Sequence, residues 1–177
     1  MNACSAKFFA DDSIAMSRAY EAVLMQCAHM LSNFLYRFSS IARELAAKGV
    51  QVKLVACDLE SEASVAAMLA EIDSFGVDVE IVFNNAGLMS KYFVNYFENT
   101  LPDFHQALAV NFLAPVQIAY HFLPKMVDRG FGRMLLTTSG IANEPELMAY
   151  ACAKAALTKF VKDFANKFNG TDVMLNL

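Results

Sequence analysis

Apolar, β-branched runs alternate with helical patterns from residue 41 to residue 177. The run from Val77 to Phe83 is apolar enough for a central strand of a parallel sheet, which is buried on both faces. Strands that alternate with helices of ten or more residues indicate an α/β fold with a parallel sheet. An apolar share of 56% and a charged share of only 18% fit a sheet covered on both faces. We therefore expect one α/β domain over residues 1–177.

Glycine, proline and capping residues set the expected boundaries of these elements. Strands are expected at residues 50–57, 77–83, 133–138 and 172–177, and helices at 41–48, 61–74, 100–127 and 147–168. Gly49 and Gly130 are well placed to end helices. Thr100 and Asp103 form a potential capping box, and Pro115 is expected to bend the long helix.

Residues 1–40 allow two interpretations. The first is a strand at 6–10, a helix at about 13–30 and a strand at 33–38. The second is a single amphipathic helix from Ser13 to Lys48, because apolar residues recur there at three- and four-residue steps. We favour the first, since a doubly wound sheet places its first strand in the middle and would otherwise have a gap.

Tyr150 and Lys154 are four residues apart on an expected helix, so the phenol and the ammonium share one face. A free phenol has a pKa of about 10, and a nearby cation lowers that pKa by favouring phenolate. Ser139 ends an expected strand eleven residues upstream of Tyr150, with Thr138 as an alternative hydroxyl beside it. Asn111 lies in the long helix, among apolar neighbours that would leave its amide buried.

Asn84-Asn85-Ala86-Gly87 follows the expected strand 77–83, and Asp58-Leu59 follows the strand 50–57. In an open parallel sheet, ligands bind outside the carboxyl ends of the strands, where Ser139 is also expected. Together with Asn111, Tyr150 and Lys154, these motifs resemble the short-chain dehydrogenase/reductase family over residues 41–177. That resemblance implies a Rossmann-like, doubly wound parallel sheet in three α/β/α layers.

The resemblance also implies an activity: NAD(P)-dependent reduction of a carbonyl or oxidation of an alcohol. Tyr150 would exchange a proton with the substrate, while Lys154 would lower its pKa and hold the nicotinamide ribose. Ser139 would orient the carbonyl, and Asn111 would hold a water that connects Lys154 to solvent. The expected cofactor contacts are Asp58, Leu59, Asn85, Ala86, Gly87, Tyr150 and Lys154. Arg37 slightly favours NADP over NAD, because an arginine can meet a 2′-phosphate.

The chain departs from the family pattern at both ends. The family has a glycine-rich turn whose backbone N–H groups hold the pyrophosphate, yet residues 1–48 contain no glycine. The expected position, Phe9 to Ala15, carries Asp11 and Asp12, which would repel phosphate. Family members also continue beyond the last strand into a substrate-covering region. We therefore expect a truncated or degenerate member, with a sheet incomplete at its C-terminal edge and weakened cofactor binding.

An alternative function is a catalytically inactive member that acts as an interaction subunit. In the family, the helices expected here at 103–127 and 147–168 pair two copies, which implies a homodimer or homotetramer. Five positions of the first helix could supply such a face, although burial against the chain's own sheet is the simpler account of them: His105, Leu108, Phe112, Val116 and Tyr120.

Composition argues against several other classes of function. The net charge is −4 with no basic run, which disfavours binding to nucleic acid. The cysteines and histidines are too scattered for a metal site. The apolar stretch 22–38 contains too many polar residues to span a membrane. An acidic pair at Asp11 and Asp12 interrupts any signal sequence, so a cytoplasmic protein is expected. The family resemblance implies a small-molecule carbonyl or alcohol as its substrate.

Overall fold

The computed structural model describes residues 21–27, 43–89 and 95–177. These belong to two compact units: Met1–Leu59 with Ala63–Val77, and Glu60–Glu62 with Asp78–Leu177. Within the described residues, each unit contains one sheet of parallel strands. The expectation of a single domain over residues 1–177 stays a prediction.

The first unit contains two paired strands. β1 (Glu21–Cys27) runs parallel to β2 (Gln51–Cys57), with Glu21 opposite Gln51 and Cys27 opposite Cys57. Residues 43–47 are helical, and Gly49 follows them with a positive φ of 82°, as expected for a helix end. α2 (Glu62–Ser74) supplies most of the buried apolar side chains of this part of the chain, which are Val55, Cys57, Leu59, Val65, Met68, Leu69 and Ile72.

The second unit is built on three parallel strands in the order β3-β4-β5. These strands are β3 (Ile81–Asn84), β4 (Gly132–Leu136) and β5 (Val173–Asn176). One face is buried, and its side chains are Val82, Asn84, Met134, Leu136, Val173 and Leu175. The alternate side chains, Ile81, Phe83, Leu135 and Met174, are apolar but exposed. The strands are thus apolar toward both faces, as in sheets that helices cover on both sides.

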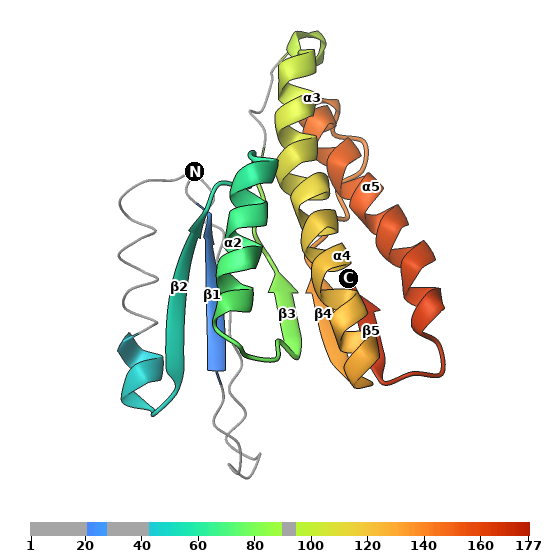
Figure 1. Cartoon of the computed structure of the whole chain (residues 1–177). Helices are drawn as coiled ribbons and strands as arrows, with labels where there is room; N and C mark the ends of the chain where they lie inside the picture. Colours follow the sequence, from blue (N-terminus) through green and yellow to red (C-terminus); the bar gives the residue numbers. More distant parts are fainter. Residues whose placement is uncertain (1–20, 28–42, 90–94) are drawn as a thin grey trace. The chain divides into compact units, whose positions relative to one another are not determined.

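The described residues of the second unit form three α-helices, two of which pack on this sheet. They are α3 (Leu101–Leu108), α4 (Ala114–Arg129) and α5 (Met148–Ala165). α4 packs on β4 and α5 on β5, and both run along the same face of the sheet (Figure 1). Ala107 of α3 packs against Ala149 and Ala153 of α5, where small side chains allow a close approach. Short 3₁₀ turns lie at Tyr96–Glu98, Pro145–Leu147 and Asn166–Phe168.

The ends of the long helical region follow local sequence signals. At its start, the backbone N–H of Thr100 donates to the Asp103 carboxylate at 2.8 Å, so the predicted capping box is present. At its end, Gly130 takes a left-handed conformation with φ of 76° and closes α4. Between α3 and α4 the backbone forms a wide π-helical turn over Ala109–Leu113. Such turns occur as single interruptions of α-helices and are frequent at functional sites.

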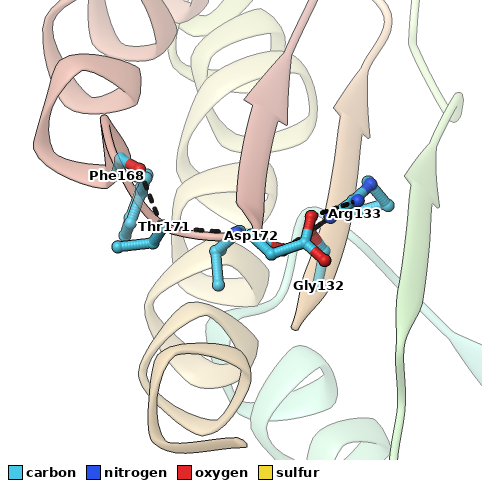
Figure 2. Close-up of polar contacts among 6 residues, drawn as sticks. Gly132, Arg133, Phe168, Thr171 and Asp172 are labelled. Carbon is cyan, nitrogen blue, oxygen red and sulfur yellow. Dashed lines mark hydrogen bonds and ion pairs between the residues drawn. The ribbon is translucent and has the colours of Figure 1, made fainter. Parts of the chain in front are cut away.

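Arg133 ties the starting ends of β4 and β5 together (Figure 2). Its guanidinium donates to the carbonyl oxygens of Gly132 and Asp172 at 2.9 and 2.6 Å and to the Asp172 carboxylate at 2.5 Å. It also lies over the Phe131 ring, 4.4 Å from the ring centre. Beside it, the hydroxyl of Thr171 donates to the carbonyl of Phe168 and accepts from the N–H of Val173. These contacts occupy the edge of the sheet opposite the carboxyl ends of the strands.

The continuous helical region Leu101–Arg129 is long and apolar enough to cross a membrane by length and composition, and it is the one such helix among the described residues. Half of its most apolar window is buried inside this structure. α4 buries seven side chains, including Ile118, Phe122 and Met126, so the apolar character follows from its place in the core.

Both interpretations of the N-terminal region were wrong about residues 21–27, which they placed in a helix. These residues form β1, a strand in register with β2. Helical and extended patterns are hard to separate in a short apolar run such as Ala22–Met25, and pairing with a neighbouring strand decides between them. The strands expected at 6–10 and 33–38, and the turn at Phe9–Ala15, lie outside the described residues.

One further expectation is corrected in the second unit. The strand expected at 77–83 begins only at Ile81, because its partner β4 begins at Gly132 and pairs Arg133 with Ile81. A π turn lies just before Pro115, near which a bend was expected. The other expected elements from residue 50 onward agree with the structure to within three residues at each end.

Candidate functional site

Tyr150 and Lys154 lie on one face of α5, as their spacing predicts. The Lys154 ammonium nitrogen is 6.0 Å from the centre of the Tyr150 ring. Tyr150 is half-buried, whereas Lys154 is only 3% exposed. The pair therefore consists of a partly exposed tyrosine and a buried lysine on the same face of α5.

A buried lysine needs partners, because removing an ammonium from water is costly. The Nζ atom of Lys154 donates to the backbone carbonyl of Thr137 at 2.8 Å, and Thr137 directly follows β4. The N–H of Thr137 donates in turn to the Asn84 carbonyl at 2.9 Å, and its hydroxyl donates to the Asn85 side chain at 2.8 Å. Lys154 is thus anchored where β3 and β4 end.

Asn111 lies at the centre of the π turn and is completely buried. Its amide forms two hydrogen bonds with the backbone of Leu88: Nδ2 donates to the carbonyl at 2.8 Å, and Oδ1 accepts from the N–H at 3.0 Å. This pair of bonds holds the loop after β3 against the helix. The two polar atoms of the Asn111 side chain are therefore both bonded to the backbone of Leu88.

Gly87 lets the buried amide and the buried amine approach the same stretch of backbone. A Cβ atom on Gly87 would lie 3.1 Å from Oδ1 of Asn111 and 3.4 Å from Nζ of Lys154. Both polar atoms therefore converge on one side of Gly87, although the residue is exposed to solvent elsewhere. A larger residue would crowd both of them.

Ser139 lies just beyond the end of β4 and is half-buried. Its backbone N–H donates to the Thr138 hydroxyl at 2.6 Å, and its own Oγ accepts from the N–H of Ile141 at 3.2 Å. The hydroxyl of Ser139 keeps a proton that it can donate. The hydroxyl of Thr138, the alternative considered from the sequence, is bonded to Thr158 at 2.6 Å.

The predicted residues therefore fall into two groups. Seven of them belong to the second unit, and the contacts above connect the turns and helices that carry them; they are Asn85, Ala86, Gly87, Asn111, Ser139, Tyr150 and Lys154. Ala86 lies between Asn85 and Gly87 and is half-buried. Asp58 and Leu59 belong to the first unit, and the side chain of Leu59 is buried. The backbone N–H of Asp58 donates to the hydroxyl of Ser64 at 2.9 Å.

Sequence reasoning missed the groups that hold these side chains in place. The backbone of Leu88 carries no sequence signal, since any residue offers the same N–H and carbonyl. Thr158 could have been found, because it stands four residues after Lys154 and extends the face of α5 that carries Tyr150. Within the described part of the chain, no group of three or more His, Cys, Asp and Glu side chains could hold a metal ion.

A parallel α/β sheet with polar groups gathered beyond the carboxyl ends of its strands is the arrangement in which open sheets of this kind bind nucleotides. The family model described as short chain dehydrogenase matches residues 11–177. The chain therefore belongs to the short-chain dehydrogenase family of oxidoreductases.

Known proteins of this family agree with that assignment. The uncharacterized oxidoreductase YvrD of Bacillus subtilis is 30% identical over 123 residues, which cover 68% of this chain and 46% of YvrD. The chain thus spans about half the length of the curated relatives that it matches.

Solved structures show the same doubly wound Rossmann fold. The alcohol dehydrogenase of the archaeon Thermococcus sibiricus, complexed with 5-hydroxy-NADP, is 26% identical with a TM-score of 0.68; the match covers 84% of this chain and 61% of that one. An NAD⁺-bound xylitol dehydrogenase has a TM-score of 0.73 at 21% identity, with coverage of 88% and 58%.

Proposed function

We propose that this chain acts as an NAD(P)-dependent oxidoreductase of the short-chain dehydrogenase/reductase type, which reduces a small carbonyl compound or oxidises the corresponding alcohol. The observation that carries the proposal is the buried Lys154, held against Gly87 and the end of β4 with its ammonium 6.0 Å from the Tyr150 ring centre. A charge buried at a strand end beside a partly exposed tyrosine costs stability, so a catalytic use is the simplest reason for it.

In this mechanism Tyr150 gives its proton to the carbonyl oxygen during reduction, or takes it from the alcohol during oxidation. Lys154 supplies positive charge beside the phenol, and Ser139 donates its free hydroxyl proton to the same carbonyl oxygen. Asn111 holds the loop that carries Gly87 through its two bonds to Leu88, and a water at the π turn would connect Lys154 to solvent.

The residues at the strand ends suit a nicotinamide cofactor. Lys154 would bond the ribose, and the backbone from Asn85 to Gly87 would line the cofactor, with Gly87 leaving Asn111 and Lys154 room to lie against that backbone. Asp58 and Leu59 would meet the adenine. The bound nicotinamide supplies or accepts the hydride. NADP is slightly favoured through Arg37, and the neighbours bound to an NADP derivative and to NAD⁺ support both cofactors.

The direct test is a titration of the purified protein with NADPH and NADH, followed by nicotinamide fluorescence, together with turnover of a panel of aldehydes and ketones. Tyr150→Phe should keep cofactor binding and lose roughly 10²- to 10⁴-fold in turnover, because only the proton donor is removed. Tyr120→Phe is the matched control, since Tyr120 is 58% exposed on α4. Equal turnover in wild type and Tyr150→Phe would contradict the proposal.

A second candidate function is an interaction subunit, in which two copies pair through the helices around 103–127 and 147–168. An aromatic cluster of exposed Tyr120 and half-buried Phe160 and Phe164 supports it: the Tyr120 ring centre lies 6.1 Å from that of Phe160 and 5.6 Å from that of Phe164. None of the five positions named for this face is fully buried, although Leu108 packs against the buried alanines of α3 and α5. No cofactor binding at millimolar concentration, with a dimer by analytical ultracentrifugation, would favour this function. A cytoplasmic location fits either candidate.

A further inference from the structure

Helix α5 and the end of β4 are joined by a second set of contacts that the proposed mechanism does not use. The hydroxyl of Thr158 donates to the backbone carbonyl of Lys154 at 2.9 Å. The hydroxyls of Thr158 and Thr138 are 2.6 Å apart, and the hydroxyl of Thr138 accepts from the N–H of Ser139 at 2.6 Å. These bonds run from the backbone of Ser139 to the backbone of Lys154.

The direction of these bonds is fixed by counting protons. A hydroxyl has one proton to donate, and a carbonyl can only accept. Thr158 uses its proton on the Lys154 carbonyl, so the proton between the two threonines must come from Thr138. Thr138 can then only accept from Ser139. The chain therefore has a single arrangement: Ser139 N–H to Thr138, Thr138 to Thr158, and Thr158 to the Lys154 carbonyl.

We propose that Thr138 and Thr158 are positioning residues, whose oriented hydroxyl chain holds Ser139 at a fixed place relative to the turn of α5 that carries Lys154 and Tyr150. This proposal rests on the proposed oxidoreductase function. Ser139 follows the last residue of β4 by three positions and has no strand partner of its own. The bond between Nζ of Lys154 and the Thr137 carbonyl fixes the preceding backbone, and the hydroxyl chain fixes Ser139 itself.

The test compares Thr158→Val, which removes the hydroxyl while keeping the shape, with Thr158→Ser, which keeps it. Misplacing a reacting group by about 1 Å can cost on the order of a hundredfold in rate, so Thr158→Val should lower kcat by roughly ten- to a hundredfold. Cofactor affinity should be unchanged, because Lys154 and Gly87 stay in place, and Thr158→Ser should restore kcat. The matched control is Thr171→Val, whose hydroxyl also joins a carbonyl and an N–H but lies at the opposite edge (Figure 2).

A second measurement does not depend on activity. In ¹H–¹⁵N spectra, the amide resonance of Ser139 should move upfield in Thr158→Val, as its bond to Thr138 loosens, and stay in place in Thr158→Ser and Thr171→Val. An unmoved resonance in a folded Thr158→Val variant would overturn the oriented chain. If the Ser139 amide resonance moves in Thr158→Val but kcat is unchanged, the positioning role is overturned, and the hydroxyl chain contributes only to packing. Absence of turnover in wild type would contradict the proposed function itself, while the resonance still decides whether the chain exists.

Discussion

Replacing Gly87 by alanine tests the convergence of Asn111 and Lys154 without requiring any activity. The new Cβ would lie 3.1 Å from Oδ1 of Asn111 and 3.4 Å from Nζ of Lys154. Asn111 cannot retreat freely, because its amide bonds to Leu88 at 2.8 and 3.0 Å, and Leu88 is the neighbour of Gly87. Lys154 is held by the Thr137 carbonyl at 2.8 Å. The methyl group therefore has to stretch one of these bonds or displace the loop.

Overpacking of this kind typically costs about 1–3 kcal/mol. Alanine regains about 0.4–1 kcal/mol because it restricts the unfolded chain, and Gly87 is not among the glycines with positive φ. The expected net loss is about 1–2 kcal/mol in the free energy of unfolding. For a chain of this size that corresponds to about 2–8 °C in Tm. Thermal and urea denaturation followed by circular dichroism would measure both quantities.

Gly140→Ala is the matched control for this substitution. Gly140 is also exposed and also lacks a positive φ, but a Cβ there would meet no atom within 4 Å. Its replacement should leave stability unchanged or raise it by up to about 1 kcal/mol. If Gly87→Ala were as stable as Gly140→Ala, the two polar side chains would not be confined against Gly87 and the described geometry of the site would be refuted.

Two further predictions concern other parts of the chain. Arg133→Ala should lower the free energy of unfolding by about 1–2 kcal/mol in urea denaturation, because its bonds to two backbone carbonyls are lost. Asp172→Asn should lower it by under about 1 kcal/mol, because only an exposed ion pair is lost. Equal losses in the two variants would contradict the larger contribution assigned to the carbonyl bonds. Burial raises the pKa of the Cys57 thiol, a bond from Ser64 partly opposes this, and the charge of Asp58 adds to it. The raised pKa contributes stability that is complete below the ordinary thiol pKa of 9.0 and is lost as the pH rises through the higher folded value. At pH 8, a thiol reagent should modify exposed Cys152 in the folded protein but Cys57 only after unfolding, because Cys57 is buried and its pKa is raised. Peptide mass spectrometry would locate the label. Equal labelling rates of the two cysteines in the folded protein would be evidence against a buried Cys57.

The sequence predicted the second unit well because its signals were local. Gly130 ended α4, Thr100 and Asp103 capped α3, and the four-residue step placed Lys154 on the same face of α5 as Tyr150. Ser139 fell at the end of β4, because parallel strands bring their carboxyl ends to one edge of the sheet.

What the sequence did not predict depends on partners that are distant along the chain. Residues 21–27 form a strand because β2 pairs with them, and β3 starts at Ile81 because β4 sets its length. The partners of Asn111 are backbone groups of Leu88, which no side-chain pattern reveals. The π turn likewise contains no glycine or proline, so the sequence carries no local signal that predicts it.

The π turn has a consequence for how the long helical segment can evolve. A wider turn lodges one additional residue in a helix, and each residue rotates the following side chains by about 100°. α3 therefore directs Ala107 toward α5, while α4 directs Ile118 and Met126 into the core beside the sheet, and the two halves need not share one stripe. Deleting one residue between positions 109 and 113 would turn the helical region 101–129 into a regular α-helix. The apolar face of either α3 or α4 would then rotate away from its packing partners and toward water. The number of residues in this helical segment is therefore constrained, because a deletion or insertion of one residue misplaces the buried side chains. The identity of its outward side chains is much less constrained.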